Sequence, residues 1–359
     1  MCYPPQDYVG TIPADTRGRT IVVAASNSID PTLAPAAYRC DGVADQVEIN
    51  AAITALGAIG GTVILLEGTY NITASINLAS NVTLIGQGAG TVLKIPNAFN
   101  ANLNVISASS KNRVLVADLK IDGNKANQGS FGQFNYGIYF NTVTHSKVVH
   151  CWVEDMCNDG ITLDTSDNNT ITGNTCQSNR THGIYLFASN NNTIMGNNCQ
   201  STDMGAGLYL DTDSNNNTIM GNNCQNNGDV GIGLGGCSNN TITGNTCQGN
   251  SYEGICLTLA NNNTITGNTV IGNSQDADNT YDGIIIGYDS DYNNVGENTV
   301  RHAGGAKQHR YGINIETVDC DGSLVINNDL YLAGKTADYG NAGTGTIYHN
   351  NRTTAGWVA

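Results

Sequence analysis

His182 is the residue in this sequence best suited to acid–base chemistry, because a free imidazole titrates near neutral pH. It stands directly before Gly183-Ile184, and Asp159 stands before the same dipeptide one repeat earlier. Tyr185 follows three positions after His182. If the fold brings these side chains to one surface, they would supply a base (His182), a neighbouring charge (Asp159) and a proton donor (Tyr185). Such groups can abstract a proton next to a carboxylate. Whether they meet depends on the elements that carry them.

Those elements repeat. A Gly followed by an apolar residue recurs in steps of 23, 23, 24, 24, 23, 29 and 29 residues, at Gly137, Gly160, Gly183, Gly207, Gly231, Gly254, Gly283 and Gly312. The phrase Asn-Asn-Thr-Ile-Thr-Gly-Asn-Thr-Cys keeps the same period at 168–176 and 239–247. A period near 23 predicts a solenoid, and short alternating segments between Gly, Asn and Asp turns predict strands. We therefore expect an all-β protein, a single-stranded parallel β-helix of about 10–12 coils.

Alternation predicts which side chains face outward. If the apolar residue after each Gly points inward, the residue before the Gly and those two and four after it lie on one outer face. In the coils starting at 137, 160, 183 and 207, these positions hold Tyr136, Tyr139, Asn141, Asp159, Thr162, Asp164, His182, Tyr185, Phe187, Tyr209 and Asp211. The next coil has Val230, Gly233 and Gly235, so we expect a bland face beyond it. Four coils, roughly 15–20 Å long, would suit a groove for three or four sugar units.

One column of cysteines is explained by packing. Val153, Cys176, Cys199, Cys224, Cys247, Val270, Val300 and Leu330 occupy equivalent places in successive coils. Eleven cysteines is an odd number and no Cys-x-x-Cys pair occurs, so a disulfide framework or a metal cluster is disfavoured. We expect Cys176, Cys199, Cys224 and Cys247 to form a buried, reduced and metal-free ladder, because a buried thiol behaves as a small hydrophobe. Alternation instead points Cys256 outward.

Composition limits the partners. The chain has 359 residues, 40% of them apolar, and 15 Lys and Arg against 30 Asp and Glu give a net charge of −15. This balance argues against nucleic acid and anionic membranes as partners. No apolar run is long enough for a membrane span, and no signal peptide is visible at the start. The sequence requires no cofactor, but Ca²⁺ held by Asp159 and Asp164 would neutralise a polyanionic ligand.

We expect one domain over 1–359, with protected ends because open strand edges are a liability. Residues 1–60 should hold a first strand and a capping helix over 45–57, with Asp45 as N-cap and Glu48 three residues later. The apolar helix face is formed by Ile49, Ala52, Ile53 and Leu56. The coils fill 61–330, with a loop at 123–135, and 331–359 form a C-terminal cap that Trp357 closes.

Several short motifs of this sequence resemble motifs of known protein families. Asp41-Gly42, Gly60-Gly61-Thr62-Val63 and Gly68-Thr69-Tyr70 are similar to the start of many pectate-lyase-like proteins, including viral tail spikes. Over nearly the whole chain and in the same order, further stretches resemble the catalytic modules of bacterial mannuronan C-5 epimerases: Ile121-Asp-Gly-Asn-Lys125, Val153-Glu-Asp-Met156, Tyr311-Gly-Ile-Asn-Ile-Glu316 and Asn327-Asn-Asp-Leu330. The resemblance implies a right-handed parallel β-helix that acts on polysaccharide, and it places Lys125 near the substrate carboxylate.

The resemblance fails at the catalytic motif. Epimerases of this kind carry Tyr-Gly-Phe-Asp-Pro-His, whose Tyr and His are thought to move the C-5 proton, and this chain has Asp159-Gly-Ile-Thr-Leu-Asp164 instead. Separately, Asn158-Asp159-Gly-Ile followed by Thr181-His182-Gly-Ile resembles the Asp-Asp and Gly-His-Gly elements of polygalacturonases. The Asn-Thr-Asp and Arg-Ile-Lys elements of that family are not found here.

These observations favour a polysaccharide-active protein that abstracts the C-5 proton of a polyuronate, alginate-like or pectin-like, as an epimerase or lyase. The catalytic candidates are His182, Asp159, Tyr185 and Lys125, and the substrate-binding candidates are Tyr136, Tyr139, Arg180, Tyr209 and Asp211. Two alternatives stay open. One is a glycoside hydrolase, which needs two carboxylates; the other is a non-catalytic glycan-binding spike or structural protein. Each function implies an extracellular or virion-associated location, and monomer and trimer both remain open.

Overall fold

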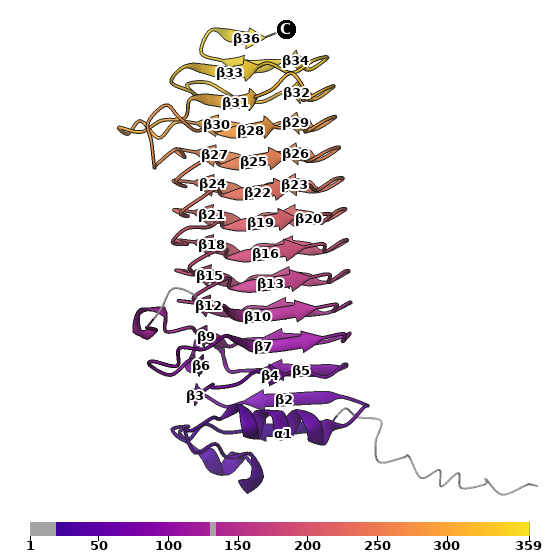
Figure 1. Ribbon diagram of the computed structural model, residues 1–359, viewed down its shortest axis with the longest axis vertical. Coiled ribbons are helices and arrows are strands. Elements are labelled where there is room, and N and C mark those ends of the chain that lie inside the picture. Colours follow the sequence, from indigo (N-terminus) through magenta and orange to yellow (C-terminus); the bar gives the residue numbers. More distant parts are fainter. Residues whose placement is uncertain (1–18, 130–133, 359) are drawn as a thin grey trace, which may run out of the picture.

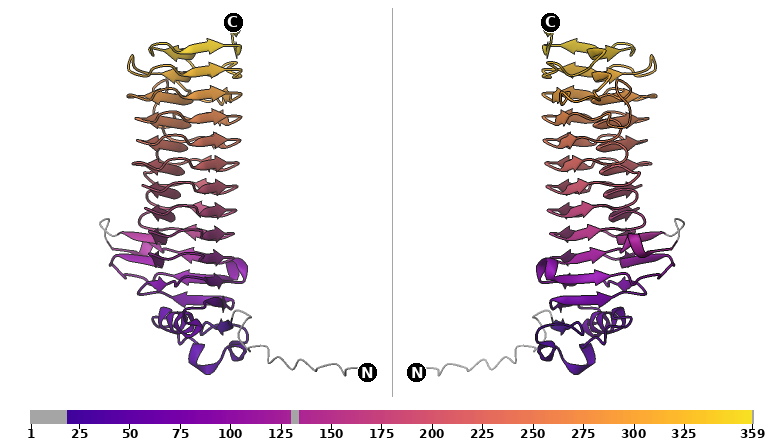
Figure 2. Two further views of the ribbon diagram at one scale, coloured as in Figure 1. Left: turned by 90° about the vertical axis from the view of Figure 1, so that its right-hand side faces the viewer. Right: turned by 90° about the vertical axis from the view of Figure 1, so that its left-hand side faces the viewer.

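The computed structural model describes residues 19–129 and 134–358, which wind into a long stack of coils (Figure 1). Most coils contribute one strand to each of three parallel sheets, and within these sheets each strand pairs only with its equivalents in the neighbouring coils. The side views show the same rod, with one helix at the end near the N-terminus (Figure 2). The architecture is a parallel β-helix, as the 23-residue period predicts.

Sheet 1 has 13 strands: β1 (Arg19–Val23), β2 (Gly61–Leu65), β5 (Val82–Ile85), β8 (Leu115–Ala117), β11 (Lys147–Val149), β14 (Thr170–Thr172), β17 (Thr193–Met195), β20 (Thr218–Met220), β23 (Thr241–Thr243), β26 (Thr264–Thr266), β29 (Asn294–Gly296), β32 (Leu324–Ile326) and β34 (Ile347–His349). Sheet 2 has 11: β4 (Ile76–Asn77), β7 (Leu103–Ser109), β10 (Asn135–Asn141), β13 (Ile161–Asp164), β16 (Ile184–Phe187), β19 (Leu208–Asp211), β22 (Ile232–Gly235), β25 (Ile255–Thr258), β28 (Ile284–Gly287), β31 (Tyr311–Ile315) and β33 (Ala337–Asn341). Sheet 3 has 10: β3 (Gly68–Asn71), β6 (Thr91–Lys94), β9 (Lys120–Asp122), β12 (Trp152–Glu154), β15 (Thr175–Gln177), β18 (Asn198–Gln200), β21 (Asn223–Gln225), β24 (Thr246–Gln248), β27 (Thr269–Ile271) and β30 (Thr299–Arg301).

The recurring Gly marks the sharp entry into sheet 2, where successive coils pass closest to one another. A Cβ built on Gly160 would lie 2.7 Å from the carbonyl oxygen of Gly183, and one on Gly183 would lie 2.6 Å from that of Gly207. A side chain there would collide with the backbone of the next coil. The Gly period is therefore a steric requirement of coil stacking.

Buried Asn ladders tie the coils together at the corners. In the ladder Asn174, Asn197, Asn222, Asn245 and Asn268, each backbone N–H donates to the side-chain oxygen of the next Asn over 2.8–2.9 Å. The side-chain amides donate back to strand carbonyls, for example Asn222 to Ile194 over 2.9 Å. Two further ladders follow the same rule at the other corners, so the Asn-rich phrases satisfy backbone groups that turns leave unpaired.

The Cys column is confirmed as a buried ladder. Cys176, Cys199, Cys224 and Cys247 lie in register in β15, β18, β21 and β24, all are fully buried, and their thiols are free. Hydrogen bonds with Cys176 and Cys224, together with burial, raise the pKa of Cys199 well above its ordinary value. The Cys199 thiol therefore stays protonated, and all four side chains pack within the apolar core.

The capping helix is α1 (Gln46–Leu56), and its buried face is formed by Ile49, Ala52, Ile53 and Leu56, as the apolar spacing predicts. Asp45 is the N-cap residue of α1, as predicted, but its side chain makes no capping hydrogen bond. Asp45 has helical backbone angles, and its carboxylate accepts from the backbone N–H groups of Gly42 and Asn71 instead of capping α1. The side chain therefore joins the helix to the incoming chain and to the first coil.

The C-terminal end is closed differently from the sequence expectation. The antiparallel hairpin of β35 (Asn351–Thr353) and β36 (Gly356–Val358) lies on the last coil, and Asn351 continues an Asn ladder by accepting from Asn328 over 2.9 Å. Trp357 is 68% exposed, so it does not cover the end by burial. Within the described residues, no helix is both long and apolar enough to span a membrane.

His309 ends one Asn ladder and makes it sensitive to acid. It is fully buried, its Nε2 accepts from the backbone N–H of Asn273 over 2.8 Å, and Nδ1 lies 3.1 Å from the carbonyl of Ala333. Burial lowers the pKa of His309 to about 4. Only the neutral ring fits. In an imidazolium, Nε2 would carry a proton and face the N–H of Asn273, and two donors cannot bond each other.

Acid should therefore loosen this end of the stack. The folded pKa lies below the ordinary value, so the contribution of neutral His309 is complete above about pH 6.5 and is lost as the pH falls toward 4. We expect a loss of about 3 kcal/mol across that window. Unfolding followed from pH 7.5 to 4 should show a steeper decline for the native chain than for His309→Asn, which supplies an amide acceptor that does not titrate. Equal slopes would contradict the assignment.

Candidate functional site

The outer face of sheet 2 aligns the candidate residues as the sequence predicts. Tyr139, Thr162, Tyr185 and Tyr209 lie in one column across β10, β13, β16 and β19, and Asn141, Asp164, Phe187 and Asp211 lie in the next. Backbone bonds from Gly137 to Asp159 and from Gly160 to His182 place the residues before each Gly in a third column. Parallel register thus brings residues about 23 positions apart into direct contact.

The rings of His182, Tyr185 and Tyr209 form a compact triangle, in which the centroids of the two tyrosines are 6.3 Å apart. Its ring centroid is 5.2 Å from that of Tyr185 and 5.2 Å from that of Tyr209, with interplanar angles of 19° and 18°. Nδ1 of His182 accepts from the backbone N–H of Ala206 over 3.0 Å. The neutral ring therefore carries its proton on Nε2, which is left as a hydrogen-bond donor on the outer face.

The side chains of Tyr139 and Tyr185 reach carboxylates of the following coil. The hydroxyl of Tyr139 donates to Asp164 over 2.5 Å, and that of Tyr185 donates to Asp211 over 2.8 Å. Burial, together with these acceptors, raises the pKa of Tyr139 to about 12 and that of Tyr185 further. These hydroxyls consequently act as donors and not as bases at neutral pH.

Tyr209 differs because its hydroxyl has no partner among the described residues. The place of the acceptor in the next coil is taken by Gly235, and a Cβ there would lie 2.8 Å from the Tyr209 hydroxyl oxygen. A Cβ on Gly233 would lie 2.5 Å from the ring. Burial raises the pKa of Tyr209 to about 12, so the hydroxyl keeps its proton. The two glycines, which looked bland in sequence, make room for an aromatic ring with a free donor.

Asp159 is held by the protein and does not touch the His182 ring. It is 4% exposed, and its carboxylate accepts from the backbone N–H of His182 over 2.9 Å and from the hydroxyls of Thr181 and Thr162. Asp164 likewise accepts from Tyr139, Asn141 and Thr165. Both predicted calcium ligands are thus already bonded to protein donors.

The two predicted cations lie in the loops that lead from sheet 3 to sheet 2. Lys125 donates to the carbonyl of Ser178 and pairs with Asp203, both over 2.7 Å. Burial raises the pKa of the Cys157 thiol, and the positive charges of Lys125 and Arg180 act in the opposite direction and lower it. Lys125 and Arg180 therefore lie near the same buried thiol.

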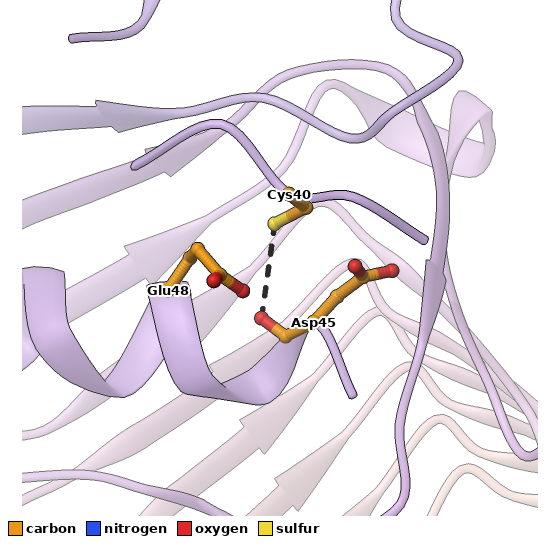
Figure 3. Close-up of side chains that lie close together, drawn as sticks. All are labelled: Cys40, Asp45 and Glu48. Atoms are coloured by element: carbon orange, nitrogen blue, oxygen red, sulfur yellow. Dashed lines mark hydrogen bonds between the residues drawn. The ribbon is translucent and has the colours of Figure 1, made fainter. Parts of the chain in front are cut away.

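One trio of acidic and thiol side chains converges elsewhere, at the N-terminal end of α1 (Figure 3). Cys40, Asp45 and Glu48 bring potential ligand atoms within 4.8 Å of one another. The arrangement does not suit a metal, because Asp45 already accepts two backbone N–H groups and burial raises the pKa of both Cys40 and Asp45. The thiol instead approaches the carbonyl of Asp45 at 3.7 Å.

The expectation of a bland face beyond residue 231 is wrong. Asp282 is fully buried and pairs with Arg310 over 3.0 and 2.7 Å, and Glu253, Cys256 and Glu316 occupy the same outer columns. The signal was present in the sequence, since these residues stand before Gly or two and four positions after it. The alternation rule that places His182 on the outer face therefore also places Asp282, Glu253, Cys256 and Glu316 in its columns.

Comparisons with known proteins agree with this architecture. A model described as "right handed beta helix region" matches residues 62–219, and one described as "periplasmic copper-binding protein (NosD)" matches residues 198–352. No curated protein sequence matches the chain. Within 198–352, no three His, Cys, Asp or Glu side chains converge as possible metal ligands.

Solved structures give the same result. The A-module of a mannuronan C-5 epimerase from Azotobacter vinelandii is 22% identical, with a TM-score of 0.63 over 87% of this chain and 94% of that one. Gene product 12 of bacteriophage phi29 is 15% identical, with a TM-score of 0.69 over 87% of this chain and 50% of that one. Tailspike protein 2 of Escherichia coli O157:H7 bacteriophage CAB120 is 15% identical, with a TM-score of 0.67 over 84% and 44%. The chain is a right-handed parallel β-helix protein, with the layout of the epimerase modules.

Proposed function

We propose that this protein binds a polysaccharide along the outer face of sheet 2, with His182, Tyr185 and Tyr209 as the central sugar-binding group. The observation that carries the proposal is the triangle of three rings, which leaves two donors, Nε2–H of His182 and the hydroxyl of Tyr209, without a protein acceptor among the described residues. Stacked rings bind the apolar face of a sugar, and the donors fix its orientation.

The preferred ligand is a polyuronate. Lys125 bonds Ser178 and Asp203 in the loops that lead to β16 and β19, and Arg180 lies in the first of these loops, in a chain that is otherwise strongly acidic. Both free donors suit a carboxylate acceptor. The likeness in fold to proteins named as mannuronan C-5 epimerases and a phage tailspike supports carbohydrate as the ligand class. An extracellular or virion-associated location is part of the same proposal.

Turnover of the polyuronate by C-5 proton abstraction is the second candidate function. The close packing of His182 with Tyr209 favours it, because one could remove and the other return a proton. As held in the structure, however, His182 donates from Nε2 and its other nitrogen is engaged by Ala206. A base at this place requires the Ala206 bond to open, so binding is the function that the geometry supports best.

A panel of oligosaccharides tests both functions. Binding is measured by calorimetry with oligomers of mannuronate, guluronate and galacturonate and with neutral glucans. The same mixtures are then followed for ultraviolet absorbance, reducing ends and C-5 configuration. Polyuronate binding without product supports the first function, while an unsaturated or inverted product supports the second. A panel in which no polyuronate binds would overturn both.

Calcium dependence is a separate expectation. If a polyanion bridges to the acidic face through Ca²⁺, a chelator should weaken polyuronate binding at least about tenfold, and added Ca²⁺ should restore it. Asp211 accepts from two groups, Tyr185 and Thr212, against three each for Asp159 and Asp164, so it is the carboxylate of the three with most capacity left for an ion. Affinity that is unchanged by chelator would remove the ion and leave Lys125 and Arg180 as the neutralising groups.

A further inference from the structure

A second group of polar and aromatic side chains lies beyond the central group. We name it the Tyr252 cluster and define it as Asp229, Tyr252, Glu253, Tyr281, Asp282 and Arg310. These residues end the loops that enter β22, β25, β28 and β31. At the usual spacing of parallel strands, Tyr252 and Tyr281 lie roughly 10–15 Å along the stack from Tyr209.

The cluster contains an aromatic platform. The ring centroids of Tyr252 and Tyr281 are 4.5 Å apart with an interplanar angle of 32°. Both side chains are partly exposed, and neither hydroxyl has a partner among the described residues. Longer coils build this region, because the steps into Gly283 and Gly312 are 29 residues each. In Figure 1 the extra residues form the loops that project beside β27 and β30.

An internal ion pair fixes the platform at its C-terminal side. Asp282 accepts from Nε and Nη2 of Arg310, from the side chain of Asn314 over 3.0 Å and from the backbone N–H of Tyr311 over 3.0 Å. The buried carboxylate is fully bonded, and its charge cancels that of the guanidinium. Arg310 is therefore held in place and adds little net charge for a ligand.

The remaining acids of the cluster lie near the platform, since the pKa of Tyr281 is raised first by burial, then by Tyr252 and Asp276, and then by the charges of Glu253 and Asp229. Burial, followed by the charges of Asp282 and Asp229, raises the pKa of Glu253 to about 7. The other titratable groups around it are Cys256 on the same strand, whose pKa burial raises to about 12, and Glu316, which lies 3.9 Å from Arg310. Near neutral pH, Glu253 can thus donate as well as accept a hydrogen bond.

Charge separates the two sites. In the Tyr252 cluster, Arg310 is neutralised by Asp282, so Asp229 and Glu253 leave the cluster acidic. A uronate brought to Asp229 and Glu253 would meet like charge, but the hydroxyl groups of a neutral sugar would find acceptors. An aromatic platform bordered by carboxyl groups suits such a ring.

We propose that the Tyr252 cluster is a second carbohydrate-binding site, selective for a neutral sugar unit, in which Tyr252 and Tyr281 stack on the ring and Asp229 and Glu253 bond its hydroxyl groups. The site adds to the proposed polysaccharide-binding function and rests on it only for the assignment of the ligand to carbohydrate. The two sites together would recognise a chain, or two chains, that offer both charged and neutral units.

The test uses neutral hexasaccharides of glucose, mannose and galactose, and a guluronate hexasaccharide as the charged comparison. Tyr252→Ala and Tyr281→Ala should each weaken binding of the best neutral hexasaccharide about tenfold and leave guluronate binding within twofold. Tyr292→Ala removes an equally aromatic but distant and exposed side chain, and should change neither affinity. Chemical shifts of the Tyr252 and Tyr281 rings should move on titration with the neutral sugar in the native chain.

The outcomes separate the two proposals. Guluronate binding that Tyr209→Ala abolishes, with no neutral hexasaccharide bound, would overturn the second site and keep the first. Neutral binding that Tyr209→Ala removes but Tyr252→Ala does not would place the neutral sugar at the central group and also overturn the second site. A guluronate affinity that falls in Tyr252→Ala would contradict its selectivity.

Discussion

Replacing Tyr209 by Ala is expected to weaken polyuronate binding by at least about tenfold, because one face of the His182 stack and a free donor are lost together. Replacing His182 by Ala should do the same, since it removes the ring that contacts both tyrosines and the Nε2 donor. If the protein also turns over its ligand, His182→Ala should lower turnover at least about a hundredfold, the usual scale for a general acid or base.

Controls on the same face sharpen this test. Tyr209→Phe keeps the stack and removes only the hydroxyl, so it should lose less affinity than Tyr209→Ala. Gly233→Ala places a Cβ 2.5 Å from the Tyr209 ring and should displace it, giving the loss of Tyr209→Ala without any change at residue 209. Combining Gly233→Ala with Tyr209→Ala should then add nothing further. Native affinity in all of these variants would place the ligand elsewhere on the molecule.

Replacing Cys199 by Asp is expected to unfold the middle coils. The side chain is fully buried between Cys176 and Cys224, so a carboxylate there would lack donors and solvent. The cost is on the order of several kcal/mol, which is a large part of the stability of a typical domain. Cys199→Val keeps the apolar contacts and should cost no more than about 1.5 kcal/mol.

The matched control is Gln200→Asp. Gln200 follows Cys199 in β18 but points outward, where its side chain bonds Gln177. Thermal unfolding followed by circular dichroism should show a large fall in midpoint for Cys199→Asp alone. A folded Cys199→Asp protein of native stability would mean that the column is accessible to water, and a thiol count showing paired cysteines would contradict the reduced ladder.

The sequence by itself determined the architecture. Each coil repeats the same steric and hydrogen-bonding problem, so Gly at the entry to sheet 2, Asn at the corners and Cys in the ladder recur with one period. Because the strands pair in parallel and in register, the period alone aligns Tyr185 with Tyr209 and places His182 one coil from Asp159. The buried face of α1 followed from apolar spacing in the same way.

Only the tertiary structure decided what the aligned side chains do. Asp159 bonds the backbone of His182 and not its ring, the Ala206 N–H sets the tautomer of that ring, and Tyr209 extends over two glycines of the next coil. Each of these contacts depends on side-chain torsion angles and on a neighbour about 23 residues away. The repeat period predicts the neighbour but not the torsion angles. Asp45 shows the same limit, since its sequence pattern marks a helix cap while its oxygens find nearer donors in the first coil. The repeat period determines which residues lie next to each other, whereas the hydrogen-bond donors and acceptors around each side chain determine its chemistry.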